Sequence, residues 1–289
     1  MSAAPTVCPP GTAVTAPGAP RPVTPVGILA ATLDEVLEQA RRGALDADGL
    51  ERLQTARDLA AGLDPYLERC TTPESPALAE LARRTAEHDW RAHDGDTGLE
   101  QEMLSGHVEG QLLRTLVHAT RARTVLEVGM FTGYSALAMA EAVGDGGRVV
   151  ACEVDAEVAA FAQECFAAST AGGRIDVRVG PAADTLRALA AAGERFELVF
   201  VDADKAGYAG YLDLLLGGGP GSGLLAPRGL VVVDNTLMQG RPWVSAEPTG
   251  NGAAVAAFND ALATDPRVEQ VLVPLRDGLT LVRRATQED

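Results

Sequence analysis

The stretch ELVFVDADKAGY (residues 197–208) joins a run of four apolar residues, Leu198 to Val201, directly to three charged side chains. A short, continuous apolar run is typical of a strand that is buried on both faces of a parallel sheet. Open α/β sheets bind their ligands beyond the carboxyl ends of the strands. The charges of Asp202, Asp204 and Lys205 therefore predict a functional site at the tip of this strand.

The same rhythm of strand and helix extends on both sides of this stretch. β-Branched segments alternate with Ala- and Leu-rich segments, which predicts five βα units and an α/β fold whose parallel sheet is covered on both faces. Two further strands around the turn RDG (276–278) predict a C-terminal antiparallel hairpin. Strands are expected at 124–129, 148–154, 175–180, 198–203, 229–235, 268–275 and 279–284, and helices at 135–143, 156–168, 182–192, 208–216 and 252–264.

The N-terminal part has a different pattern and predicts separate regions. Residues 1–26 contain seven prolines and no periodicity, which predicts a disordered tail. Residues 27–100 predict a helical region punctuated by prolines such as Pro65, with Ser75 capping a helix over 77–88 and the segment DGDTG (94–98) forming a loop. The main domain is then expected over 101–289, beginning with a helix over 107–120.

Composition limits the classes of partner. The formal net charge is −16 and the pI is about 4.7, which argues against nucleic acids and anionic membranes as partners. The four cysteines are scattered and form no CxxC pair, so neither zinc nor redox chemistry is expected. The N-terminus lacks the pattern of a signal peptide and no apolar run approaches 18 residues. We expect a soluble, cytoplasmic protein.

The loops after the first three predicted strands suggest a nucleoside site. Gly129 and Gly133 allow close backbone approach, but their spacing is GxxxG, whereas a dinucleotide site has GxGxxG. An acid at the end of the second strand is placed to bind ribose hydroxyls, and Glu153 is favoured over its neighbour Asp155. The small residues of VGPAAD (179–184) leave room for a flat adenine.

Oxygen-bearing side chains follow the fourth and fifth strands, which are usually close in this topology. Asp202, Asp234 and Asn235 are therefore expected to converge, and two carboxylates with an amide suit Mg²⁺, Mn²⁺ or Ca²⁺. The alternative is that these residues are ordinary loop acids and helix caps. Lys205 is placed to accept a proton from a hydroxyl group, and the alternative is that it only balances the charge of Asp204.

Long segments resemble the caffeoyl-CoA and catechol type of cation-dependent O-methyltransferases, which use S-adenosylmethionine. The segments are MLSGHVEGQLL (103–113), LEVGMFTGYSALAMA (126–140), FELVFVDADKAGY (196–208), VVVDNTLMQG (231–240) and LATDPRVEQVLVPLRDGLTLVRR (262–284). A narrower resemblance, through RPVTPVGIL (21–29) and LAAGLDPYLERCTTPESP (59–76), is to the O-methyltransferases of mycosporine biosynthesis, which convert demethyl-4-deoxygadusol to 4-deoxygadusol. The resemblance implies a class I methyltransferase (Rossmann-like) fold with added N-terminal helices.

The resemblance also implies roles for individual residues. Lys205 would be the general base, with Asp202 as its catalytic partner, and Asp202, Asp234 and Asn235 would hold a divalent cation, most readily Mg²⁺. A small-molecule acceptor would lie against Met103, Lys205, Met238 and Trp243, where Met238 replaces a tryptophan of the plant enzymes. S-adenosylmethionine would contact Met103, Ser105, Glu127, Gly129, Tyr134, Ser135, Glu153, Pro181, Ala182 and Asp202. A homodimer is expected from the family, with the last hairpin offering an edge for pairing.

Three other functions remain open at this point. The same chemistry on a catechol or a hydroxycinnamoyl ester is the nearest alternative to a 4-deoxygadusol-type cyclohexenone. A nicotinamide-dependent oxidoreductase is disfavoured because no GxGxxG segment is present. A binding protein without catalytic activity is disfavoured because the expected metal and base residues are all present.

Overall fold

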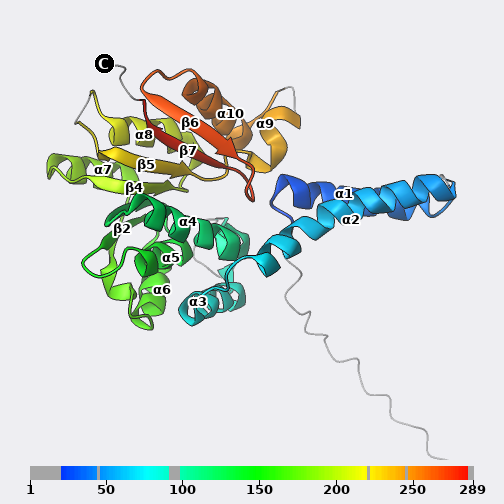
Figure 1. Ribbon diagram of the computed structural model, residues 1–289, viewed down its shortest axis with the longest axis horizontal. Helices are drawn as coiled ribbons and strands as arrows, with labels where there is room; N and C mark the ends of the chain where they lie inside the picture. Colours follow the sequence, from blue (N-terminus) through cyan, green and yellow to red (C-terminus); the bar gives the residue numbers. More distant parts are fainter. Residues whose placement is uncertain (1–20, 44–45, 91–97, 220–221, 245–246, 286–289) are drawn as a thin grey trace, which may run out of the picture.

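The computed structural model describes residues 21–43, 46–90, 98–219, 222–244 and 247–285 of the 289-residue chain. Most of the tail predicted over 1–26 and most of the DGDTG loop lie outside the described residues. Figure 1 shows a helix-covered sheet and, to one side of it, a pair of long helices.

A seven-stranded sheet forms the centre of the molecule, in the order β3-β2-β1-β4-β5-β7-β6. Strands β1 to β5 are parallel, and β7 pairs antiparallel with both β5 and β6, which confirms the α/β class with a C-terminal hairpin. The order places β4 beside β5, as expected. The strands are β1 Thr124–Val128, β2 Arg148–Glu153, β3 Ile175–Val179, β4 Phe196–Val201, β5 Leu225–Val233, β6 Val268–Val273 and β7 Leu279–Arg284.

Helices cover both faces of the sheet because consecutive strand residues point to opposite sides. Val125 and Val149 pack under α3, α4, α5 and α6, whereas Leu126 and Val150 pack under α7, α8 and α10. β5 begins earlier than expected, because Leu225 pairs with Phe196 before an irregularity in the register. The helices are α3 Pro76–Glu87, α4 Gly106–Thr120, α5 Tyr134–Ala142, α6 Ala156–Ala167, α7 Ala182–Ala191, α8 Tyr208–Leu216, α9 Arg241–Val244 and α10 Gly250–Ala263.

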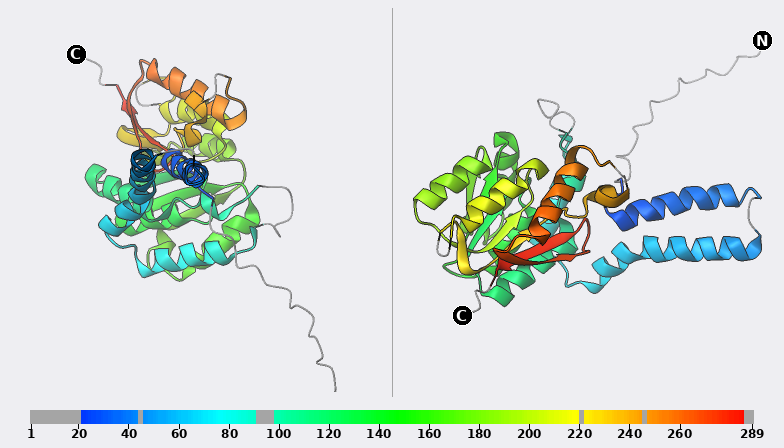
Figure 2. Two further views of the ribbon diagram at one scale, coloured as in Figure 1. Left: turned by 90° about the vertical axis from the view of Figure 1, so that its right-hand side faces the viewer. Right: turned by 90° about the horizontal axis from the view of Figure 1, so that it is seen from above.

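Two N-terminal helices, α1 (Pro25–Ala40) and α2 (Ala47–Cys70), pack against each other and project from the sheet domain (Figures 1 and 2). The boundary of the tail at residue 26 was wrong, because α1 already begins at Pro25 and the Thr24 hydroxyl accepts a hydrogen bond from the Gly27 amide. A hydroxyl cap followed by proline is a helix-start signal. Pro65 lies inside α2 and does not end it.

The prediction that Ser75 caps the next helix is confirmed, since its hydroxyl accepts from the Leu78 amide. Within the ranges that the structure describes, no helix is both long enough and apolar enough to cross a membrane.

Candidate active site

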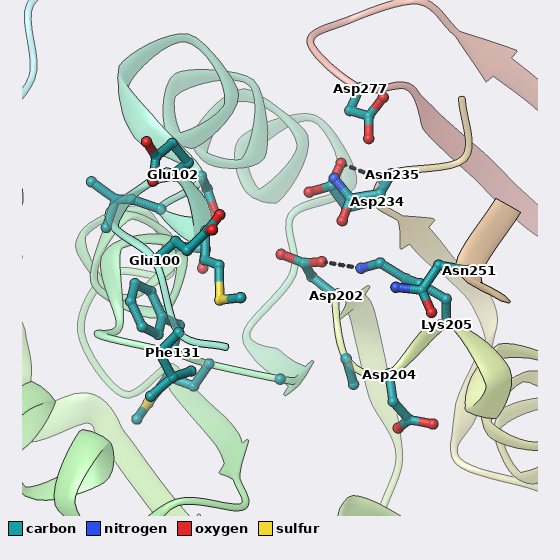
Figure 3. Close-up of a pocket in the computed structure, with 18 of the residues that line it drawn as sticks. Glu100, Glu102, Phe131, Asp202, Asp204, Lys205, Asp234, Asn235, Asn251 and Asp277 are labelled. Carbon is teal, nitrogen blue, oxygen red and sulfur yellow. Dashed lines mark hydrogen bonds and ion pairs between the residues drawn. The ribbon is translucent and has the colours of Figure 1, made fainter. Parts of the chain in front are cut away.

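A cavity of about 860 Å³ opens beyond the carboxyl ends of β1, β2, β4 and β5 (Figure 3). This is the edge at which parallel sheets bind their ligands. The predicted site residues that line it are Met103, Ser105, Gly129, Tyr134, Ser135, Glu153, Pro181, Ala182, Asp202, Lys205, Asp234, Asn235 and Met238.

The loop after β1 needs glycine for a reason other than close approach to a ligand. Gly129 has a φ of +89°, and a Cβ there would lie 2.4 Å from the carbonyl oxygen of Asp202. The Gly129 amide donates to the carbonyl of Cys152, while the Asp202 amide donates to the carbonyl of Val128. Gly129 therefore brings the tips of β1, β2 and β4 together, where their side chains share one cavity.

Glu153 at the end of β2 is held in place by two backbone amides. Its Oε2 accepts from the Phe131 amide at 2.7 Å and its Oε1 from the Asp155 amide at 3.0 Å. Burial raises the pKa of the carboxyl above its ordinary value, and the amide hydrogen bonds oppose this only in part. The Asp155 side chain instead accepts from the Glu157 and Val158 amides as the N-cap of α6. The structure therefore favours Glu153 over Asp155 as the acid facing a ligand.

Glu127 lies beneath the cavity floor on β1 and is fully buried. It does not line the cavity, so the prediction of a direct cofactor contact finds no support in the lining. Its two carboxylate oxygens have no hydrogen-bond partner within the described chain, and burial raises its pKa while the nearby Ser135 hydroxyl lowers it.

The tips of β4 and β5 bring Asp202, Asp234 and Asn235 together (Figure 3). The Asp234 Oδ1 accepts from the Asn235 amide at 2.6 Å, and Asn235 holds a left-handed φ of +56°. Asp234 is buried. Burial and the negative charge of Asp202 raise the pKa of Asp234 to about 7. The arrangement concentrates oxygen donors at one point, where the positive charges of Lys205 and Arg276 oppose the rise in the pKa of Asp234 only in part.

Lys205 pairs with Asp202, with its Nζ donating to Oδ1 at 2.8 Å (Figure 3). The two side chains are 11% and 18% exposed, so the pair is shielded from water. The ion pair of Lys205 is therefore with Asp202 and not with Asp204, whose carboxylate accepts a hydrogen bond from the Tyr211 hydroxyl. Lys205 thus stands beside the oxygen cluster and faces the cavity.

The acceptor wall differs in part from the prediction. Met238 lines the cavity, but Trp243 does not: it is 58% exposed and packs over Gly240. Arg241 lines the cavity instead. Trp243 follows it by two residues in the same short helix, so its side chain points to nearly the opposite side of the helix.

Sequence reasoning missed several lining residues, some beside predicted site residues and others from distant segments of the chain. They include Arg21, Glu100, Glu102, Gln239, Asn251, Arg276 and Asp277. One structural signal marks some of them: of the six non-glycine residues with positive φ in the described chain, five line the cavity, and only Arg121, at a helix end, does not. Such conformations are costly and concentrate at functional sites.

Comparison with known proteins identifies the family of the chain. The family model described as O-methyltransferase matches residues 68–285. Catechol O-methyltransferase domain-containing protein 1 of Mus musculus is 36% identical over 218 residues, covering 75% of this chain and 77% of the relative. Caffeoyl-CoA O-methyltransferase 2 of Zea mays is 34% identical over 228 residues, covering 75% of this chain and 80% of the relative.

Solved structures extend the similarity to the fold. The methyltransferase PaMTH1 of Podospora anserina, solved with SAH bound, is 29% identical with a TM-score of 0.67, and the match covers 79% of this chain and 96% of that one. The O-methyltransferase TomG of Streptomyces achromogenes, solved in complex with SAM, is 28% identical with a TM-score of 0.65 and coverages of 78% and 96%. The chain belongs to the O-methyltransferase family and is an S-adenosylmethionine-dependent O-methyltransferase.

Proposed function

We propose that this enzyme methylates a hydroxyl of a small acceptor that carries two adjacent oxygens, with a divalent cation at Asp202, Asp234 and Asn235. The observation that carries the proposal is the convergence of two carboxylates and an amide at the tips of β4 and β5, next to Lys205 and in one cavity with Glu153. The acceptor that we propose is demethyl-4-deoxygadusol, which would place the enzyme in mycosporine biosynthesis.

The chemistry of the donor set supports a cation. Two acids that face each other repel, and this repulsion together with burial is what raises the pKa of Asp234. Within the described residues no three His, Cys, Asp or Glu side chains form a metal-binding group, and the proposal takes the amide oxygen of Asn235 as the third donor. Oxygen donors of this kind suit Mg²⁺, with water completing the coordination. When bound, the cation would supply positive charge that favours the ionised form of an acceptor hydroxyl.

The residues of this chain then have separable tasks in an in-line displacement at the sulfonium methyl group. Glu153 would bind the ribose of S-adenosylmethionine and so fix the methyl donor at the β1–β2 side of the cavity. Lys205, held by Asp202, would take the proton of the acceptor hydroxyl. The buried Met238 would help to exclude water and to hold the acceptor oxygen in line with the S–CH₃ bond.

The nearest competing acceptor is a catechol or a hydroxycinnamoyl ester, since relatives are named for both. Met238 argues for the cyclohexenone, because it offers no flat aromatic wall against a phenolic ring, and Trp243 does not replace one. One enzyme preparation should be assayed with S-adenosylmethionine and demethyl-4-deoxygadusol, catechol or caffeoyl-CoA, following product mass. The proposal expects the highest kcat/KM with demethyl-4-deoxygadusol. A higher value with either phenol would overturn the choice of acceptor and leave the reaction class intact.

We also propose a homodimer in the cytoplasm. β6 is an edge strand of the sheet, and Val271 on it is exposed. The projecting helices α1 and α2 carry a second group of exposed apolar side chains, namely Leu29, Val36, Leu59, Leu63 and Tyr66. Unpaired edges and apolar stripes of this kind are surfaces that a second copy can cover.

A further inference from the structure

Arg276 adopts a backbone conformation that its residue type disfavours. It lies in the turn between β6 and β7 with a φ of +49°. Glycine adopts the left-handed region without the Cβ clash that other residues suffer there. The turn alone would favour glycine at this position. Because Arg276 lines the cavity, we infer that its side chain has a function there that offsets the backbone strain.

The surrounding residues hold one edge of the guanidinium. Nη2 donates to the carbonyl of Leu104 at 3.1 Å, and Nε lies 3.6 Å from Oε2 of the buried Glu109. The group also lies over Gly106, where a Cβ would come within 2.7 Å of Nη1. No hydrogen bond within the described part of the chain engages Nη1, and the side chain, 28% exposed, lines the cavity. The guanidinium is therefore oriented by the protein, with donors left over for a ligand.

The position of Arg276 relates it to the acceptor end of the cavity. The turn that carries it lies against the loop after β5, since the Leu237 amide donates to the Asp277 carbonyl at 2.8 Å and the Thr236 amide to the Gly278 carbonyl at 3.0 Å. The other cation beside the oxygen cluster, Lys205, already pairs with Asp202. Arg276 is thus a cation that the protein orients on this side of the cavity, where it can meet negative charge on the acceptor.

We propose that Arg276 selects acceptors that carry a negative charge close to their two adjacent oxygens, such as an ionised enol or a carboxylate. This deepens the proposed function and rests on it for the identity of the ligand as a methyl acceptor. A planar guanidinium binds two oxygens through parallel hydrogen bonds, which gives geometric selectivity in addition to charge.

A pair of matched probes tests this selectivity by binding alone. 3,4-Dihydroxybenzoate and 3,4-dihydroxybenzamide have nearly the same shape, but only the first is an anion near pH 7. Calorimetry with SAH and Mg²⁺ present gives both dissociation constants for the wild-type enzyme, Arg276→Gly, Arg276→Gln and Arg276→Lys. Loss of a charge-assisted contact should weaken benzoate binding by about 10-fold to 100-fold in the Gly and Gln variants. Benzamide binding should change by less than about 3-fold, and Arg276→Lys should retain part of the preference for the anion.

Arg121→Gly is the matched control, because it exchanges a second left-handed arginine for glycine at the end of α4. It should leave both dissociation constants unchanged. An equal loss for benzoate and benzamide in Arg276→Gln, or no loss for either, would overturn the proposal. So would a fall in SAH affinity, since Arg276 would then serve the methyl donor. Methyl transfer is scored separately: if the wild-type enzyme methylates none of the acceptors, the proposed function fails, while the binding contrast still decides the role of Arg276.

Discussion

Asp202 has two neighbours of opposite character at the tip of β4: the ammonium group of Lys205 at 2.8 Å and the buried carboxylate of Asp234. The first neutralises it and the second repels it. A single carboxylate would in this way link the residue that we propose as proton acceptor to the cluster that we propose as the cation site. Substitutions on the two sides of Asp202 should therefore have different consequences.

Asp234→Ala removes a donor of the oxygen cluster, whereas Lys205→Ala keeps all three donors and removes the proposed proton acceptor with its ion pair to Asp202. We expect Asp234→Ala to lower turnover by several orders of magnitude with any acceptor. General-base catalysis contributes about 10²-fold to 10⁴-fold, and less when the acceptor is already acidic. Lys205→Ala should therefore lose much activity with catechol near pH 7, progressively less as pH rises, and little with an enol. Turnover measured against pH with both acceptors checks this. A loss that is equal for both and independent of pH would mean that Lys205 orients the acceptor.

Glu153→Ala should weaken S-adenosylmethionine binding by about 1.5–3 kcal/mol, because a charged acceptor of two ribose hydroxyls is lost. Asp155→Ala is the matched control two residues away: it removes the N-cap of α6 and should cost about 1 kcal/mol of folding stability without changing affinity. Calorimetric titration and thermal unfolding separate the two effects. Unchanged affinity in Glu153→Ala would assign the ribose contact to another residue.

At the scale of elements, two turns join to form the acceptor wall. The Asp277 carboxylate, in the turn before β7, accepts from the Gln239 amide at 2.6 Å, and the Asp277 carbonyl accepts from the Leu237 amide at 2.8 Å. Gly278 makes this approach feasible, since a Cβ there would lie 2.4 Å from the Leu237 side chain. The hairpin β6–β7 thus closes the cavity as well as the sheet.

Burial raises the pKa of Asp277 to about 6, above the value of about 3.9 of an unfolded aspartate. Between these two values the native state binds more protons than the unfolded state, so Asp277 makes stability fall as pH rises from 4 to 6. The full effect on the free energy of unfolding is at most about 3 kcal/mol and is reached by about pH 7. Asp277→Asn has no titrating group at this position, so it lacks this pH-dependent contribution to stability. In urea unfolding with chelator present, the stability of the variant relative to wild type should increase from pH 4 to 6 and then level off. A difference that does not depend on pH would contradict the buried titration.

The sequence predicts the tips of the strands well and the turns between distant elements poorly. Asp202, Asp234 and Asn235 could be placed together because parallel strands bring their carboxyl ends to one edge. Arg276 and Asp277 were interpreted only as part of a hairpin turn, because their return to the cavity depends on β7 lying between β5 and β6. Trp243 was placed wrongly because its spacing from Asn235 did not reveal that a short helix turns it outward.

At the scale of the whole molecule, α1 and α2 are joined to the sheet domain at one end and extend away from it (Figures 1 and 2). Leu59, Leu63 and Tyr66 recur at helical spacing on α2 and are 74%, 41% and 56% exposed. None of the described residues of α2 is buried. A helix of this kind gains little from folding alone, which is the reason to expect that a second copy covers it.

The double variant Leu59→Lys/Leu63→Lys should convert the proposed dimer to a monomer, since it would place two charges among the exposed apolar side chains of α2 that the second copy is expected to cover. Its thermal stability at low concentration should be close to that of the wild-type monomer, because both side chains are already exposed. Val271→Lys tests the edge of β6 in parallel. Sedimentation velocity gives the masses. A dimer that survives the α2 variant but not Val271→Lys would assign the interface to the edge strand, and a wild-type monomer would refute the dimer altogether.

The central claim is that the oxygen cluster at the tips of β4 and β5 requires a divalent cation for methyl transfer. The most direct measurement is methyl transfer from S-adenosylmethionine to demethyl-4-deoxygadusol, followed by product mass in excess chelator and after addition of Mg²⁺ or Mn²⁺. We expect chelation to abolish transfer, either metal to restore it, and Asp234→Ala to resist restoration. Full activity in chelator, with no metal in the purified enzyme, would contradict the claim.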